Sequence, residues 1–181
     1  MIDNRKIISR VHHWVEKAVI GLDLCPFAGL VYAQNKLRCV VSDSEQVDDL
    51  MLDLYRQCQY LIDTPGTDTT LLIIPHQLQD FTDFNQMLDQ ADALVKTYEW
   101  TGVFQIASFH PGYQFNNTSI DDRENWTNRS PFPILHILRE SSVERALSGF
   151  ANPERIVEAN IRTLTAIEVT EFEHIFKPDH F

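Results

Sequence analysis

Apolar residues recur along the chain at two spacings, one typical of amphipathic helices and one typical of strands that are buried on both faces. Helical spacing predicts three long helices and a weaker one near the C-terminus, over residues 7–22, 47–62, 81–98 and 156–167. Short apolar runs predict four strands, at residues 37–41, 70–74, 103–109 and 134–138. Strands and helices therefore alternate, which favours an α/β fold.

Polar residues mark where these helices are expected to begin. Side chains that can cap a helix N-terminus precede three of them: Asp3, Asp80 and Asn152, the last followed by a proline. Two further starts are expected from capping-box spacing, in which a serine precedes a glutamate by three residues: Ser42 with Glu45, and Ser141 with Glu144. The second of these boxes predicts a helix directly after the fourth strand.

Three strands separated by helices of about eighteen residues predict a βαβαβ unit with parallel strands. The expected fold class is α/β, a three-layer-like open sheet with this parallel βαβαβ core plus a fourth strand and C-terminal helices. The direction of the fourth strand stays open. We expect residues 1–181 to form a single domain, because no linker or repeat divides them, with a disordered or loosely attached tail at about 172–181.

The long polar segment between the third and fourth strands, residues 110–131, is where a site is most expected. A connection of this length is unusual in a compact domain and is either functional or disordered. Aromatic residues such as Phe115 and Trp126 argue against disorder, so we expect an ordered loop that builds a site. His110 opens this loop, and His76 follows the preceding strand. Because the carboxyl ends of parallel strands meet at one edge of a sheet, both histidines are expected there.

Composition and charge narrow the classes of partner. The chain has 181 residues, of which 44% are hydrophobic and 23% charged, as in an ordinary soluble globular protein. A net charge of −11 disfavours nucleic-acid binding, and a site for an anion would need local arginines or helix N-termini. The apolar runs are too short to cross a bilayer and the N-terminus lacks the pattern of a secretory signal, so we expect a cytoplasmic protein without membrane association.

Three residues are candidates for catalysis: His110, Cys25 and Asp122. The imidazole of His110 can act as a general acid, a general base or a metal ligand, or it can be hydrogen-bonded to hold the loop. Cys25, which precedes a proline, can be a nucleophile if a nearby cation lowers its pKa, or a small buried apolar residue. Asp122, beside Asp121, can supply a base or a metal ligand, or can simply be solvated.

Arginine is the residue best suited to bind an anion, because its guanidinium matches a carboxylate or a phosphate. The candidates are Arg129, next to Asn128 in the loop, and Arg139 at the end of the fourth strand, with internal ion pairs as the alternative. Arg139 would leave the site if the fourth strand ran antiparallel to the others. His136 and His76 complete the candidate ligand-binding set, the alternatives being a hydrogen-bonded core histidine and an exposed loop histidine.

Four segments of the chain are similar to a known family: LDLCPFA at 22–28, TTLLIIP at 69–75, FQIASFHPGYQF at 104–115 and NRSPFPILHILRE at 128–140. Together they resemble the uncharacterised bacterial family catalogued as domain of unknown function 1415, and the similarity extends to about Ile167. The resemblance implies a single-domain, cytoplasmic bacterial protein, and it carries no assigned activity or catalytic residue.

Three functional hypotheses follow. The first is an enzyme that acts on a small anionic metabolite in a pocket under residues 110–131. His110 would be the acid or base, Arg129, alone or with Arg139, would hold the anion, and Cys25 or Asp122 would assist. The second is a non-catalytic domain that binds a ligand or a protein partner through its aromatic loop. The third is a metal-dependent hydrolase that uses His110, an aspartate of the loop, and His76 or His136. The sequence contains no GxSxG, Walker A or GxGxxG motif, so it identifies neither a reaction nor a cofactor.

Overall fold

The apolar run near residue 70 forms the strand β2 (Thr69–Ile73), and burial on both faces explains its composition. In the computed structural model, which describes residues 3–148 and 155–176, all five residues of β2 are buried. Leu72 packs with one group of helices, while Leu71 and Ile73 pack with another group on the opposite face. A strand in this position has no solvent-facing side, so its apolar residues are consecutive rather than alternating with polar ones.

The other strands are β1 (Leu37–Val41), β3 (Phe104–Phe109) and β4 (Ile134–Arg139). They form a sheet of order β1-β2-β4-β3, in which β1 is parallel to β2 and β4 is antiparallel to both of its neighbours. β1, β2 and β3 therefore run in the same direction, with β4 inserted between β2 and β3. The predicted open α/β sheet is confirmed, and the direction that the sequence left open is antiparallel.

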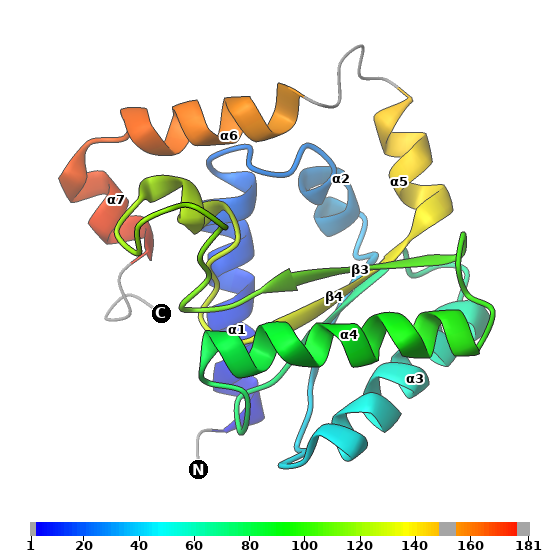
Figure 1. Ribbon diagram of the computed structural model, residues 1–181. Helices are drawn as coiled ribbons and strands as arrows, with labels where there is room; N and C mark the ends of the chain where they lie inside the picture. The colour runs from blue at the N-terminus through cyan, green and yellow to red at the C-terminus, as the bar shows by residue number, and fades with distance from the viewer. Residues whose placement is uncertain (1–2, 149–154, 177–181) are drawn as a thin grey trace.

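Helices cover both faces of this sheet (Figure 1). Two long helices lie on one face: α3 (Val47–Asp63) and α4 (Phe81–Thr97). The other face carries α1 (Asn4–Trp14), its π-helical continuation η1 (Val15–Ile20), α6 (Arg155–Ala166) and α7 (Val169–Phe176). Two short helices stand over that same face: α2 (Ala28–Ala33) and α5 (Glu140–Leu147). The arrangement is the helix–sheet–helix order of a three-layer α/β fold.

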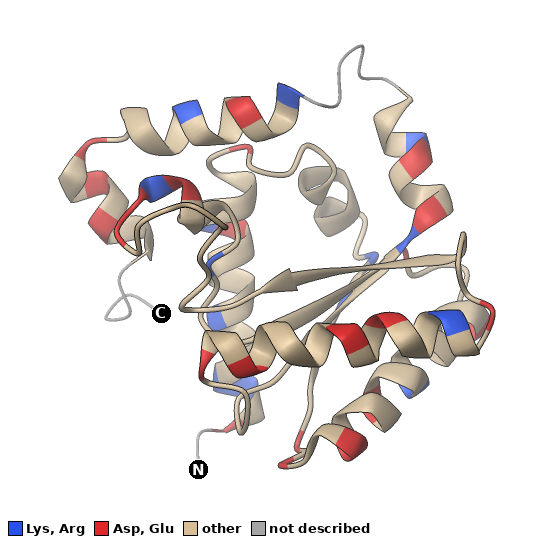
Figure 2. Ribbon diagram, viewed as in Figure 1, with Lys and Arg blue, Asp and Glu red and all other residues tan. Residues whose placement is uncertain are grey.

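Charged residues are spread over the helices rather than confined to one of them. Acidic residues occur along α3, α4, α5 and α7, with lysine and arginine interspersed (Figure 2). The net charge of −11 is therefore distributed over the helical surface. Within residues 3–148 and 155–176, none of the helices combines the length and the apolar character needed to span a lipid bilayer.

Two of the predicted helix starts are confirmed. The Asp3 carboxylate accepts a hydrogen bond of 3.0 Å from the backbone N–H of Arg5 at the start of α1. The Asp80 carboxylate accepts one of 2.7 Å from the backbone N–H of Thr82 at the start of α4. Each bond satisfies a backbone donor that has no partner inside the helix. The predicted cap Asn152 lies outside the described residues.

The two predicted capping boxes are wrong. α3 begins without a side-chain cap, and the Ser42 hydroxyl instead donates to the Asp53 carboxylate at 2.7 Å. Ser42 is held away from the helix start because its backbone N–H continues the β1–β2 ladder by bonding to the carbonyl of Ile73. α5 begins at Glu140, directly after β4, so Ser141 lies inside the first turn and cannot cap it.

The C-terminal segment is packed where the sequence predicted a disordered or loosely attached tail. Phe172 and Phe176 both contact Trp126, with 5.0 Å between ring centroids in each pair. Ile175 is also buried, and its spacing from the two phenylalanines gives α7 one apolar face. The packed part of the predicted tail is thus residues 172–176, and residues 177–181 lie outside the described part of the chain.

Truncating Phe176 tests this packing. Because Phe176 is 5% exposed, Phe176→Ala should lower the free energy of unfolding by about 3 kcal/mol. Val169, on the same helix, is 59% exposed, and Val169→Ala should change it by less than about 0.5 kcal/mol. Urea denaturation of the two variants and the wild type measures both values. A loosely attached helix would leave both variants as stable as the wild type.

Candidate functional site

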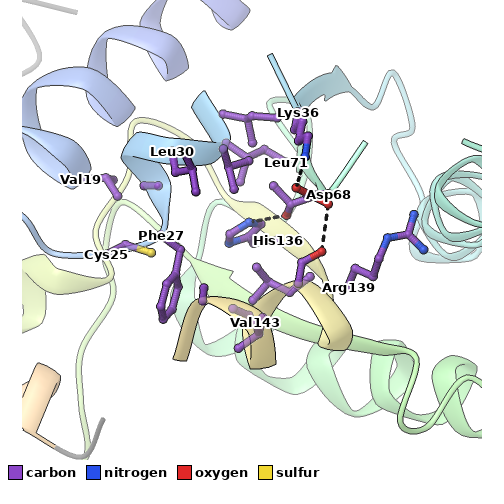
Figure 3. Close-up of a pocket in the computed structure, with 18 of the residues that line it drawn as sticks. Val19, Cys25, Phe27, Leu30, Lys36, Asp68, Leu71, His136, Arg139 and Val143 are labelled. Carbon is purple, nitrogen blue, oxygen red and sulfur yellow. Dashed lines mark hydrogen bonds and ion pairs between the residues drawn. The ribbon is translucent and has the colours of Figure 1, made fainter. Parts of the chain in front are cut away.

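A cavity of about 660 Å³ lies between the sheet and the helices α2 and α5 (Figure 3). Its floor is one face of the sheet, where Leu71, His136 and Ala107 are neighbours on β2, β4 and β3. Its walls are largely apolar and include Val19, Phe27, Leu30 and Val143. Small-molecule pockets typically enclose about 300–1,000 Å³ with mostly apolar walls and a few polar groups. This cavity therefore has the size and lining of a binding site.

Charged residues gather at the end of the cavity where β1 and β2 begin (Figure 3). Asp68, directly before β2, accepts a hydrogen bond of 2.9 Å from the Ser142 hydroxyl and lies 3.5 Å from Lys36 Nζ. Arg145 on α5 lies 3.6 Å from the same carboxylate and donates to the Ser142 hydroxyl at 2.9 Å. Two cations and one anion give this group a positive charge. The Arg145 side chain is 66% exposed, so it can turn toward a ligand without losing a buried contact.

His136 occupies the floor of the cavity. Its Nε2 lies 2.7 Å from the Thr69 hydroxyl, and that hydroxyl donates to the carbonyl of Ile137 at 2.7 Å. Because the single hydroxyl proton is used on the carbonyl, Nε2 must donate its own proton to Thr69, and Nδ1 keeps its lone pair. Burial lowers the pKa of His136 to about 4. The ring is therefore neutral at neutral pH and offers the cavity a hydrogen-bond acceptor.

Cys25 lines the same cavity, in the segment that leads into α2 (Figure 3). Burial raises the pKa of its thiol, and hydrogen bonds with the backbone of Phe27 and Ala28 offset this only in part. The thiol therefore stays protonated at neutral pH, which is its less nucleophilic form. Burial also raises the pKa values of Cys39 and Cys58, each to about 12, and all three cysteines are free thiols.

Arg139 also borders the cavity, but Figure 3 shows its guanidinium turned away from it. The guanidinium donates hydrogen bonds to the carbonyls of Leu61 and Thr67, the second at 3.2 Å. Leu61 lies in the last turn of α3, which contains no basic residue, so Arg139 supplies the positive charge that stabilises a helix C-terminus. Because β4 is antiparallel, Arg139 pairs with Phe104, at the end of β3 opposite His110. The two residues are thus on different edges of the sheet.

His110 is buried, with an exposed fraction of 1%. Its Nε2 donates to the carbonyl of Leu78 at 3.0 Å, and its Nδ1 accepts a hydrogen bond of 2.9 Å from the backbone N–H of Gly112. Its ring contacts the rings of Phe81 and Phe84 on α4. Burial lowers the pKa of His110, although the bond to the Leu78 carbonyl opposes this. Since both ring nitrogens are occupied, we infer that His110 holds the loop against α4, the alternative that the sequence left open.

Hydrogen bonds also hold the rest of residues 110–131. Arg129 donates from Nε to the carbonyl of Tyr113 at 3.1 Å and from Nη2 to that of Ile120 at 2.6 Å. Its guanidinium lies over the Trp126 ring, 4.6 Å from the centroid. The amide of Asn128 donates to a backbone carbonyl of β3 at 3.1 Å. These two residues therefore join the ends and the middle of the loop to each other and to the sheet.

Asp122 and His76 are both exposed. The Asp122 carboxylate accepts a hydrogen bond of 2.7 Å from the backbone N–H of Ser119, just before the short 3-10 helix η2 (Arg123–Thr127). His76 lies in the connection from β2 to α4. In the part of the chain that the structure describes, no three His, Cys, Asp or Glu side chains come together as metal ligands. The set suggested for a metal-dependent hydrolase is therefore not assembled there.

The eight predicted site residues fall into three groups, according to whether they line a large cavity, a small cavity or neither. The large cavity is bordered by Cys25, His136 and Arg139. A smaller cavity of about 140 Å³, beneath the loop, is lined by Arg129. Four residues line neither cavity: His110, Asn128, Asp122 and His76. No residue of 110–131 borders the large cavity, so that cavity is not the pocket expected under the loop.

A family model described as a protein of unknown function, DUF1415, matches residues 6–174. The chain belongs to this family. The match covers nearly the whole chain, includes the entire lining of the large cavity, and confirms the resemblance seen in the sequence. No curated protein and no solved structure matches the chain.

The charged end of the cavity in this DUF1415 protein was missed by reasoning from sequence. It is formed by Lys36, Asp68, Ser142 and Arg145. A signal was nevertheless present, because Lys36 and Asp68 directly precede the parallel strands β1 and β2 and so must lie at the amino edge of the sheet. The general rule for parallel sheets points to the carboxyl edge instead.

The low pKa of His136 predicts a pH dependence of stability. Unfolded, this histidine takes up a proton as the pH falls below about 6.5, whereas in the folded protein it does so only near pH 4. The neutral ring therefore contributes its full stabilisation at pH values above the unfolded pKa of about 6.5. Roughly 2–3 kcal/mol of the free energy of unfolding is lost as the pH falls from there to about 4. His136→Leu should lose this component, as measured by urea denaturation at several pH values.

His76 provides the matched control for this measurement, because it is an exposed histidine. His76→Asn should keep the pH dependence of the wild type. Other titrating groups, His110 among them, contribute equally to the pH dependence of the wild type and of both variants. A difference between two pH profiles therefore reports on the substituted histidine. A His136→Leu protein with the wild-type profile would contradict the inference that the fold holds His136 in its neutral form.

Replacing Arg139 tests whether it serves the fold rather than a ligand. Arg139→Met should lower the free energy of unfolding by about 1.5–3 kcal/mol, because the carbonyls of Leu61 and Thr67 lose a charged donor. Arg145→Met, at an exposed ion pair, should cost less than about 1 kcal/mol. Urea denaturation compares the two. Equal losses would show that Arg139 does not stabilise the end of α3.

Proposed function

We propose that this DUF1415 protein binds a small amphipathic organic anion in the large cavity. The ligand's apolar body lies on the sheet between α2 and α5, and its anionic group lies at the end marked by Lys36 and Arg145. The observation that carries this proposal is a cavity of about 660 Å³ with largely apolar walls and a positive group at one end.

Because the chain as a whole is acidic, the positive group at one end of the large cavity points to an anionic ligand. A net charge of −11 repels anions from most of the surface, so a local excess of positive charge is needed to hold one. Lys36 and Arg145 provide this excess around Asp68. Their partial exposure keeps the cost of desolvating them low.

His136 supplies a second point of recognition. Its neutral ring presents Nδ1 as an acceptor, which suits a hydroxyl or an N–H group on the ligand. Thr69, which fixes the tautomer of His136, directly follows Asp68 in the chain. The acceptor and the cations therefore lie near one another, and a ligand can meet both.

Binding is favoured over catalysis by the state of the candidate catalytic groups. The Cys25 thiol is protonated at neutral pH, and a histidine with a pKa of about 4 is a weak base. His110, the acid or base of the enzyme hypothesis, is fully hydrogen-bonded outside the cavity. The small anionic ligand of the enzyme hypothesis is thus retained, but it lies in the large cavity instead of under residues 110–131.

A pair of probes that differ in charge tests the proposal. Dodecanoate has an apolar chain and a carboxylate, whereas dodecanol has the same chain without the charge. Dodecanoate should raise the Tm of the wild type, because a ligand that binds only the folded state stabilises it. Lys36→Gln and Arg145→Gln should each weaken dodecanoate binding by about two- to fivefold and leave dodecanol binding unchanged. Titration calorimetry measures the affinities.

Filling the cavity provides the second arm of this experiment. Val143 lines the cavity from α5, so Val143→Phe should abolish dodecanoate binding. Its neighbour Glu144 is exposed and does not line the cavity, so Glu144→Phe should bind as the wild type does. Wild-type protein that fails to bind dodecanoate, or Val143→Phe protein that still binds it, would refute the proposed function.

A further inference from the structure

The small cavity beneath residues 110–131 brings together two arginines from distant parts of the chain. Arg10 comes from α1 and Arg129 from the loop, and both line this cavity of about 140 Å³. Trp14 and Trp126 lie in the same lining, so the cavity has aromatic as well as cationic walls. Two like charges at one small cavity repel each other unless an anion lies between them.

Among the described residues Arg10 forms no salt bridge, and one of its donors is unsatisfied. Its Nε is buried and makes no hydrogen bond. Its guanidinium lies over the Phe132 ring, 5.2 Å from the centroid, in a cation–π contact. A buried donor without an acceptor is unfavourable, and an anion beside the guanidinium would offset that cost electrostatically.

Arg129 is only partly satisfied by the protein. Its Nε and Nη2 each donate to a carbonyl of the loop, which leaves both donors on Nη1 and one on Nη2. Among the described residues, neither Arg129 nor Arg10 forms a salt bridge with a carboxylate. Burial lowers the pKa of Arg129, and the exposed Asp121 opposes this from a distance. Among the described residues the positive charge at this cavity is thus only partly compensated, by Asp121, in a protein whose net charge is −11.

We propose that this cavity is a binding site for a compact oxyanion, either a phosphate group or a carboxylate, held by the fork of Arg10 and by Arg129. A guanidinium fork matches two oxygens of such an anion. One water takes up about 30 Å³ of liquid, so a cavity of about 140 Å³ has room for a phosphate but not for the ligand proposed above. The site uses different arginines from the large cavity and stands independently of the proposed function.

Inorganic phosphate and acetate are the probes that test this site, at an ionic strength kept constant with chloride. At least one of them should raise the Tm of the wild type, and the stronger of the two identifies the anion class. Arg10→Gln should weaken its binding by at least about tenfold in titration calorimetry. Arg10→Lys keeps the charge but lacks the fork, so it should also bind more weakly than the wild type.

Arg5 provides the matched control, because it is exposed on the same helix and its loss changes the net charge equally. Arg5→Gln should bind the anion as the wild type does. Arg10→Gln should fold normally, since the buried Nε gives up no hydrogen bond and the side chain forms no salt bridge among the described residues, and it should still bind dodecanoate in the large cavity. The proposal is overturned if neither anion stabilises the wild type, or if Arg10→Gln or Arg10→Lys binds as tightly as the wild type.

Discussion

The insertion of β4 between β2 and β3 determines where His136, Arg139 and the start of α5 lie. Because β4 pairs with both neighbours along its length, its register is fixed on two sides. That register places His136 between Leu71 and Ala107, in the middle of one sheet face. The antiparallel direction carries Arg139 to the far edge, where it binds the end of α3. It also starts α5 beside the large cavity rather than beside the long loop.

Much of the fold could be predicted because local patterns and tertiary packing agree. The consecutive apolar residues of β2 require cover on both faces, and α3 and α4 have single apolar stripes that provide it on one side. The capping boxes failed for the opposite reason. Ser42 has a stronger partner in Asp53 and a backbone bond to the sheet, so tertiary contacts override a spacing that is correct in isolation.

The candidate site could be predicted less well, because identical residue types receive different environments. His110 and His136 both follow or lie within apolar strands, and the sequence favoured His110. In the structure both ring nitrogens of His110 form hydrogen bonds with the backbone, whereas His136 is hydrogen-bonded to Thr69 through Nε2. Which nitrogen finds a partner depends on residues up to 67 positions away, and no local spacing encodes that. The same holds for Arg139, whose acceptors lie on α3 and the following turn.

Trp14 links the two cavities physically. Its side chain is 3% exposed, packs edge-on against Phe109 at 5.2 Å between ring centroids, and borders both the large cavity and the small one. A ligand that leaves this indole in place cannot affect the other cavity through it, since coupling requires a difference between two states. A ligand that displaces the indole changes the shape of both cavities at once. Thermodynamic linkage then makes the effect reciprocal, so occupation of either cavity would alter the affinity of the other by the same factor.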